Sequence, residues 1–284
     1  MTTRIDSPSN PRIQAAVTAV ASGEKMLLEG GRMIEEALDA GVRVDEVFLQ
    51  RNLEQEREGG EDFLRRVRGE GDSHATTSSG RVTEVAARVL RKLSDLPSTR
   101  GVVALAPPPH HTLTSLSALL PSKKSSSSSS SSPLFLLLAD VQDPANVGAI
   151  LRSGEAFGVA AALLTPGCAW PFSPRALRAS AGSAFRLPVA ARVAAGEAVA
   201  WARRHGIALA GAVAHGGTAP EALGGVRPLA LVIGSEGHGI SAEIAGSLDH
   251  RVTLPLAGRI DSLNAAVAAG VLLHILTRPP APAR

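Results

Sequence analysis

Apolar and polar positions follow two different patterns along the chain, one before residue 107 and one after residue 132. In the second part, short continuous apolar runs alternate with segments whose apolar residues recur at helical spacing. Continuous apolar strands separated by helices are typical of a parallel sheet that is covered on both faces. The pattern predicts strands over residues 134–141, 159–164, 207–213, 228–234 and 250–256, and helices over residues 146–158, 173–185, 196–206, 241–248 and 261–278.

The first 106 residues show a smaller and less regular α/β pattern. Short apolar runs again alternate with segments of helical spacing, which favours a small α/β sandwich with a core of its own. The pattern predicts strands over residues 25–30, 43–49 and 100–106, and helices over residues 31–41 and 83–94.

The boundary between the two patterns is the segment 107–132, which holds a run of prolines and then eight consecutive serines at 125–132. Nothing in it repeats with the period of a helix or a strand, so it is predicted to be a flexible linker that buries no core. The expected organisation is an N-terminal domain of residues 1–106, this linker, and a C-terminal domain of residues 133–284.

Composition narrows the possible functions only slightly. The chain has 284 residues, with 29 Lys and Arg against 26 Asp and Glu, so a site for a polyanion must be a local patch. Aromatic residues make up 3% of the chain. This low fraction argues against the aromatic sheet on which common single-strand RNA binders stack bases.

Cys168 is the single cysteine, which excludes an internal disulfide and a cysteine-cluster metal site; no metal is expected. A single cysteine also favours a reducing compartment. The apolar runs 134–138 and 265–273 are shorter than the ~18 residues of a membrane helix, and the sequence begins without an apolar signal core. We therefore expect a soluble, cytoplasmic protein with no membrane partner.

Three loops at predicted strand ends carry unusual polar residues, and in a parallel sheet ligands bind beyond the carboxyl ends of the strands. The first is DVQDPANVGAILRSGEAFG at 140–158, where Asn146 can cap the helix after Pro144. Arg152 follows about one and a half helical turns later, close to a helix start that favours anions. The alternative interpretation is a capped helix with an exposed arginine.

The second loop lies in LALVIGSEGHGIS at 229–241, where three glycines surround Ser235 and Glu236. Their order is not the G-x-G-x-x-G fingerprint of dinucleotide binding, and no G-K-[ST] follows, so nicotinamide enzymes and nucleoside triphosphatases are not supported. Glycines let the main chain approach a bulky ligand closely, and Glu236 could orient a polar group. The alternative is a purely structural glycine-rich turn.

The third loop opens the segment VTLPLAGRIDSLNAAVAAGVLLHIL at 252–276. Asp261 or Ser262 can cap the last helix, which would place Asn264 inside an almost wholly apolar helix. An unpaired amide there would be costly, so Asn264 should have a fixed partner. The alternative is that its side chain satisfies the main chain of a neighbouring loop.

In this order, NVGAILRSGEAFG, VIGSEGHGIS and LPLAGRIDSLNAAVAAG resemble the three motifs of the SpoU (TrmH) family of RNA ribose 2′-O-methyltransferases, in the SPOUT superfamily. The resemblance spans residues 133–278. The first half resembles the N-terminal substrate-binding domain of many such enzymes, a fold related to a ribosomal protein. That weaker likeness rests on SPSNPRIQ, LLEGGRMIEEAL and LSDLPSTRGVVAL.

The resemblance implies a C-terminal α/β methyltransferase domain with a parallel sheet and a deep trefoil knot, a rare exception to the usual rules of topology. It implies S-adenosylmethionine as the cofactor, bound within the knot, and a homodimer with its active site near the subunit interface. Matched by motif position, the implied cofactor contacts are Gly234, Leu254 and Leu263, with Ile233, Ser235 and Gly239 close by.

The same matching implies catalytic roles for Asn146, Arg152, Glu236, Ser262 and Asn264. One proposal for the family makes the arginine a general base, but a guanidinium effectively never loses its proton in proteins. We prefer an electrostatic role, in which Arg152 grips an RNA phosphate and stabilises charge on the 2′-oxygen. Glu236 and Asn146 would then hold Arg152 and the sugar, while Ser262 and Asn264 would form walls for cofactor and ribose.

Ribosomal RNA is the favoured substrate, because transfer-RNA enzymes of the family often use basic terminal extensions, whereas the first 106 residues hold 15 basic and 17 acidic side chains. Transfer RNA is the second candidate. From another class, the alternative is a non-catalytic RNA-binding or ribosome-assembly factor of the same fold, against which the intact Arg152, Glu236 and Asn264 argue. Arg100, where the family usually has a polar neutral residue, is either an RNA contact or an incidental change.

Overall fold

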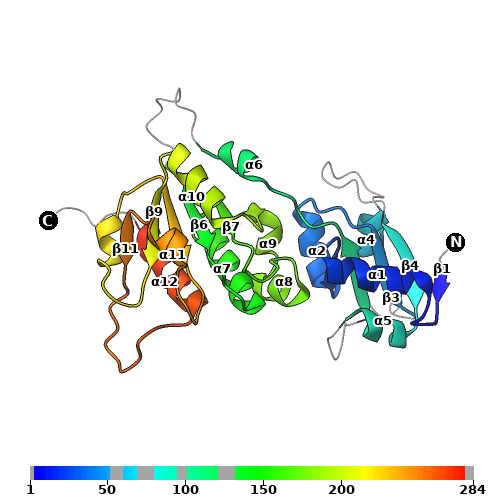
Figure 1. Cartoon of the computed structure of the whole chain (residues 1–284). Helices are drawn as coiled ribbons and strands as arrows, with labels where there is room; N and C mark the ends of the chain where they lie inside the picture. The colour runs from blue at the N-terminus through cyan, green and yellow to red at the C-terminus, as the bar shows by residue number, and fades with distance from the viewer. Residues whose placement is uncertain (1–2, 52–59, 69–79, 95–100, 121–131, 279–284) are drawn as a thin grey trace. The chain divides into compact units, whose positions relative to one another are not determined.

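The computed structural model describes residues 3–51, 60–68, 80–94, 101–120 and 132–278. The chain divides into two compact units (Figure 1), one formed by Met1–Pro109 with Phe172–Arg178 and the other by His110–Pro171 with Ala179–Arg284. Arg100 and the serine run up to residue 131 lie outside the described residues.

The N-terminal unit is built on a five-stranded mixed sheet with the order β1-β4-β3-β5-β2. Strands β1, β4 and β3 run parallel, and β5 pairs antiparallel with both β3 and β2. The strands are β1 (Thr3–Ile5), β2 (Met26–Glu29), β3 (Glu46–Gln50), β4 (Arg81–Val85) and β5 (Val102–Ala106).

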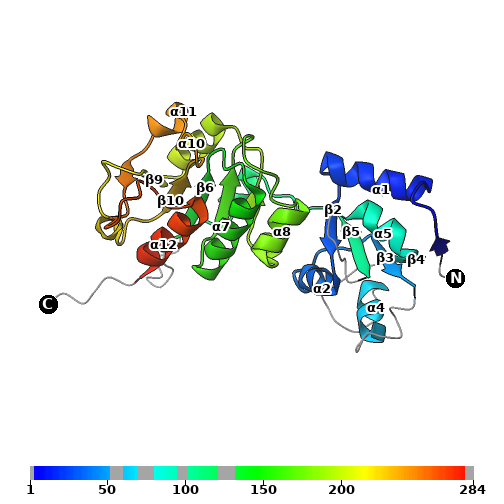
Figure 2. The ribbon, with the colours of Figure 1, turned by 90° about the horizontal axis from the view of Figure 1, so that it is seen from below.

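Helices cover both faces of this sheet, as Figure 2 shows. On one face, α1 (Pro11–Ser22) and α5 (Ala87–Leu93) pack over a buried apolar cluster that includes Phe48 of β3. On the other face lie α2 (Gly31–Asp39) and α4 (Gly60–Arg68). The expected α/β sandwich is therefore confirmed, but the sequence pattern did not predict β1, α1 or β4. The helix predicted over 83–94 begins only at Ala87, because Thr83 and Val85 point inward at strand spacing from β4.

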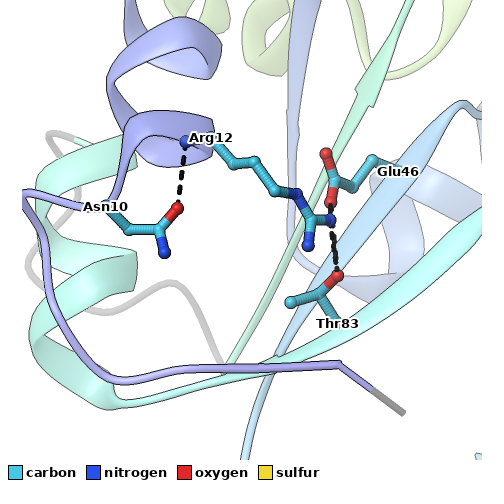
Figure 3. A network of polar contacts seen from close by, with 4 residues as sticks. All are labelled: Asn10, Arg12, Glu46 and Thr83. Carbon is cyan, nitrogen blue, oxygen red and sulfur yellow. Dashed lines mark hydrogen bonds and ion pairs between the residues drawn. The ribbon is translucent and has the colours of Figure 1, made fainter. Parts of the chain in front are cut away.

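A polar network ties α1 to the sheet beneath it (Figure 3). The Arg12 guanidinium donates to the carboxylate of Glu46 on β3 and, at 3.0 Å, to the hydroxyl of Thr83 on β4. Asn10 caps the helix by accepting the Arg12 main-chain N–H at 2.9 Å. Thr83 is fully buried, so the arginine satisfies a hydroxyl that has no access to water.

The C-terminal unit contains a six-stranded sheet with the order β11-β9-β10-β6-β7-β8, and every pair in it is parallel. This confirms the parallel sheet expected from the continuous apolar runs. The strands are β6 (Leu134–Leu138), β7 (Ala161–Leu164), β8 (Val189–Ala190), β9 (Ala208–Ala212), β10 (Leu229–Ile233) and β11 (His250–Val252).

Helices again lie on both faces. Figures 1 and 2 show α7 (Pro144–Ala156) and α12 (Ala265–Thr277) side by side. On the opposite face, α10 (Ala195–Arg204) and α11 (Ala242–Ala245) pack over an apolar cluster in which the Trp201 ring meets the Phe135 ring edge-on at 5.3 Å. The single helix predicted over 173–185 is two helices, α8 (Pro174–Ser180) and α9 (Ser183–Arg186), because Ala181 and Gly182 both have positive φ.

Part of the expected linker is folded. Residues Leu113–Ser117 form the short helix α6, whose Leu116 is buried in the core of the C-terminal unit. The Trp201 indole N–H donates to the Ser117 hydroxyl at 2.9 Å, which fixes α6 on α10. The expectation that 107–132 buries no core is therefore wrong for this helix. The polar segment 107–132 contains one short amphipathic helix, and the capping box at Thr112 is the sequence signal for its start.

Candidate functional site

A cavity of about 540 Å³ opens at the carboxyl ends of β9, β10 and β11, the edge where ligands bind in parallel sheets. The loops after these strands and the start of α12 form its walls. The six residues expected to contact a cofactor all line it: Ile233, Gly234, Ser235, Gly239, Leu254 and Leu263. Three of the five expected catalytic residues line it as well: Glu236, Ser262 and Asn264.

The loop after β10 is a tight turn closed on itself. Ser235 and Gly239 exchange two main-chain hydrogen bonds of 3.0 Å, and Gly239 has a φ of +68°. A Cβ at position 234 would lie 2.3 Å from the Gly239 carbonyl carbon. The turn itself therefore requires glycine at 234. That is a different reason from the expected one, close approach of a ligand.

Three polar side chains from distant segments meet beside the cavity. The Asn264 amide nitrogen donates to the Asn146 carbonyl oxygen at 3.0 Å, and the Asn146 amide nitrogen donates to the Glu236 carboxylate. We call Asn146, Glu236 and Asn264 the polar relay. Each belongs to a different sequence motif, so the structure brings together residues that the sequence separates by 90 or more positions.

Asn264 has a second task at the start of α12. Its side-chain oxygen accepts the main-chain N–H groups of Ala266 at 3.0 Å and Val267 at 3.3 Å, so Asn264 is the N-cap. The prediction that Asp261 or Ser262 caps this helix is wrong. The amide is not inside the helix, although its fixed partner, Asn146, does exist.

Helix α7 also begins differently from the prediction. Asp143 is its N-cap, accepting the Ala145 N–H at 2.9 Å, and Pro144 occupies the first turn. Asn146 lies inside that turn rather than before it. Because Asp143 serves the main chain, the Asn146 side chain is available to the polar relay.

Arg152 lies on α7 as an exposed side chain and is absent from the residues that line the cavity. It forms no hydrogen bond or ion pair with any residue in the described part of the chain. Glu236 and Asn146 bond to each other, and within the described residues neither bonds to Arg152.

Sequence reasoning missed several walls of the cavity. One side is formed by Ala212, the last residue of β9, with Val213 and Ala214 directly after it, and Leu272 of α12 closes another. The residues after β9 carry no polar side chain to attract attention. The rule that ligands bind beyond strand ends could have found them, since β9 was predicted correctly.

Comparisons with known proteins agree with this geometry. Residues 133–274 match the model of the SpoU rRNA Methylase family, and residues 21–104 match that of the MRM3-like substrate binding domain. A protein of Mycobacterium ulcerans (strain Agy99) named an uncharacterized tRNA/rRNA methyltransferase is 41% identical over 146 residues, which are 51% of this chain and 47% of that protein. The chain thus spans about half the length of the curated relatives it matches.

Two solved structures resemble nearly the whole chain. An RNA 2′-O ribose methyltransferase is 28% identical with a TM-score of 0.71, over 96% of this chain and 98% of the other. The SpoU methyltransferase AviRb from Streptomyces viridochromogenes, in complex with AdoMet, is 26% identical with a TM-score of 0.78, over 94% and 97%. With half of its length matched by the family model and the three motifs gathered at one sheet edge, the chain belongs to the SpoU rRNA methylase family.

Proposed function

We propose that the protein transfers a methyl group from S-adenosylmethionine to a ribose 2′-hydroxyl of ribosomal RNA. The observation that carries this proposal is the polar relay beside a cavity lined by all six expected cofactor residues. The solved relatives named above, one an RNA 2′-O ribose methyltransferase and one an AdoMet complex, support it.

The residues present fit this cofactor. Most of the cavity wall is aliphatic side chain and main chain, which suits the adenosine part of the molecule. Glu236 and Asp261 are the carboxylates among the described lining residues, and the lining holds no Lys or Arg. Acidic groups without basic neighbours suit a ligand that carries a positive sulfonium and an ammonium. The cofactor, when bound, supplies the activated methyl group.

The polar relay would position the attacking sugar. Methyl transfer requires the 2′-hydroxyl to lie in line with the methyl group and to lose its proton as it attacks. The Glu236 carboxylate can accept a hydrogen bond from a ribose hydroxyl, and the bonds through Asn146 to Asn264 hold that carboxylate in place. Arg152, as an exposed cation, would grip the RNA phosphate and stabilise charge on the 2′-oxygen.

The proposal extends to topology and assembly. After β10 the chain passes to β11 at the far edge of the sheet and returns to α12, which packs on α7. We propose that this return forms the trefoil knot. Leu256, Ile260, Val267 and Val271 are exposed apolar side chains on the returning segment, and we propose that they pair two copies into a homodimer.

The test is transfer of a labelled methyl group to ribosomal RNA purified from cells that lack this protein, followed by mapping of 2′-O-methylated riboses. We expect one or a few labelled riboses. Transfer RNA from the same cells is the second arm, because the curated relatives are named tRNA/rRNA methyltransferases. Label on a base, or on transfer RNA alone, would contradict the finer assignment. Failure of the full chain to bind S-adenosylmethionine in calorimetry would contradict the whole proposal.

A further inference from the structure

A second, smaller cavity of about 140 Å³ opens in the C-terminal unit, beyond the carboxyl ends of β7 and β8. It shares no residue with the first cavity. The loop after β7 and the two residues after β8 form its walls. Its lining consists of Leu164, Thr165, Pro166, Cys168, Ala169, Trp170, Pro171, Ala191 and Arg192.

A planar cation over an aromatic ring dominates this lining. The Arg192 guanidinium carbon lies 5.0 Å from the centre of the Trp170 ring. Trp170 is half-buried and Arg192 is exposed. Within the described residues, Arg192 donates no hydrogen bond to protein, so its N–H groups remain available to a ligand.

One residue of the cavity wall, Arg192, and one residue that bonds to the wall, Asp140, adopt left-handed backbone conformations. Arg192 has a φ of +60°, and Asp140, which follows β6, has a φ of +59°. The Asp140 carboxylate accepts the Thr165 hydroxyl at 2.7 Å, and the Thr165 oxygen accepts the Asp140 main-chain N–H at 2.9 Å. Non-glycine residues in the left-handed region are costly and concentrate at ligand sites, where the surroundings hold them in place.

We propose that this cavity holds one unstacked nucleobase of the RNA, from a nucleotide a few positions away from the methylated one; the inference rests on the function proposed above. A cavity of about 150 Å³ accommodates one six-membered aromatic ring, which is the size of a pyrimidine. Unpaired RNA bases stack on aromatic rings and on arginine planes, and Trp170 with Arg192 offers both. The Arg192 N–H groups can donate to the carbonyl oxygens at the edge of such a base.

The position of the cavity fits a strand of RNA that reaches both sites. Both cavities open at the carboxyl edge of one sheet, and β10 is separated from β7 by β6 alone. At ~4.8 Å per strand, β7 lies about 10 Å from β10, a distance of about three stacked nucleotides at ~3.4 Å each. A ribose at the first cavity therefore leaves a base a few nucleotides away within reach of the second.

Cys168 provides a direct probe, because it lines the cavity and is the single cysteine of the chain. Burial raises the pKa of its thiol, so alkylation by iodoacetamide is best followed at alkaline pH by mass spectrometry of the full chain. Short single-stranded RNA of mixed sequence should slow the alkylation severalfold. The same backbone without bases should not. Equal protection by both RNAs, or by neither, would overturn the proposal, and the assay needs no methyl transfer.

Arg192→Asn tests the same site through the reaction. Asparagine tolerates positive φ, so the variant keeps the backbone while it loses the cationic plane. We expect the KM for RNA to rise roughly tenfold, as for loss of one base–side-chain stack, with unchanged affinity for S-adenosylmethionine. Arg204→Asn, at an exposed position of α10, is the matched control and should leave the KM unchanged.

The outcomes separate the two proposals. If the Arg192→Asn variant has the same KM for RNA as the wild-type protein, the proposed base-binding cavity is refuted, while the methyltransferase assignment stands. If the unmodified protein neither binds S-adenosylmethionine nor transfers methyl groups, the assignment fails, and the Cys168 protection still decides whether the cavity takes a base.

Discussion

Asn264 shows how one side chain can cap a helix and join a polar network at the same time. Its oxygen caps α12, while its nitrogen donates to Asn146 of the polar relay. From the sequence, an amide beside an apolar helix indicates a fixed partner, but it does not say which end of the amide faces which group. Sequence reasoning therefore found the residue and its need for a partner. It could not find the cap, because Asp261 and Ser262 are equally good cap residues.

The two tasks of Asn264 can be separated by substitution. Serine caps helices almost as well as asparagine but cannot reach Asn146 with an amide, whereas alanine does neither. We expect Asn264→Ala to lower the free energy of unfolding by about 1 kcal/mol, and Asn264→Ser to lower it much less. Both should slow methyl transfer. Urea unfolding and single-turnover transfer rates check this, and a full rate in Asn264→Ser would show that the amide is not needed.

Arg152 is exposed and unpaired within the described residues, so its substitution should leave the fold intact. We expect Arg152→Lys to lose at least ~100-fold in methyl transfer, since lysine cannot reproduce the planar two-point grip on a phosphate. Cofactor affinity, measured by calorimetry, should not change. Arg204→Lys is the control. A full transfer rate in Arg152→Lys would remove Arg152 from the catalytic residues.

At the scale of elements, prediction succeeded where the environment is uniform. Strands of the parallel sheet are apolar on both faces, so β6, β7, β9 and β10 stand out in the sequence. Prediction failed where a tertiary contact or the backbone conformation of single residues determines whether an element forms or where it ends. Helix α6 exists because Leu116 finds a core to enter, and α8 ends because two residues adopt positive φ. Local apolar spacing encodes neither the burial of Leu116 nor the two positive φ values.

The turn after β10 makes a specific prediction about glycine. In Gly234→Ala the new Cβ would collide with the Gly239–Ile240 main chain, so the turn must open. We expect loss of S-adenosylmethionine binding in calorimetry and a clear loss of stability. Gly246→Ala is the matched control, because its Cβ meets the Ala242 carbonyl oxygen at an ordinary 3.5 Å. Binding of unchanged affinity in Gly234→Ala would contradict the description of this turn.

A two-point ion pair joins α7 to α9. The Arg186 side chain donates to both carboxylate oxygens of Glu155, the Nη2 bond measuring 3.1 Å, and it holds the pKa of Glu155 below its usual range. The structure thus gives Arg186 a partner within the protein.

This pair predicts a pH dependence of stability. A lowered folded-state pKa means that the pair stabilises the fold fully above the unfolded pKa of about 4.3, and that this contribution is lost as pH falls through the folded value. Glu155→Gln should therefore destabilise the protein near neutral pH, modestly because the pair is partly exposed, and cease to do so in acid. Urea midpoints of both proteins across this range test it; a difference independent of pH would contradict it.

At the scale of the molecule, the two units have separate sheets and separate cores. Within the described residues, the structure has no helix long and apolar enough to cross a membrane. The sequence predicted both sheets. It placed the start of the second unit too late, because α6 belongs to that unit.

Truncation should reveal this boundary. A fragment of residues 110–284 keeps α6, whereas 133–284 removes Leu116 from the core and leaves the Trp201 indole without the Ser117 hydroxyl. We expect the shorter fragment to be less stable by about 2–3 kcal/mol, the cost of a lost leucine and a hydrogen bond. Urea unfolding of the two fragments measures the difference. If the two fragments were equally stable, α6 would be part of the linker and not of the second unit.

The polar relay also has a consequence for how the protein folds. Its two contacts close loops of 90 and 118 residues, so they are among the most non-local contacts in the unit. Such contacts raise contact order and form late, after the intervening strands have found their places. The relay is therefore expected to close after the strands of the sheet have paired. A ligand that binds the completed site draws the folding equilibrium toward it by mass action, so the supply of cofactor would help to set how much of the newly made chain is native.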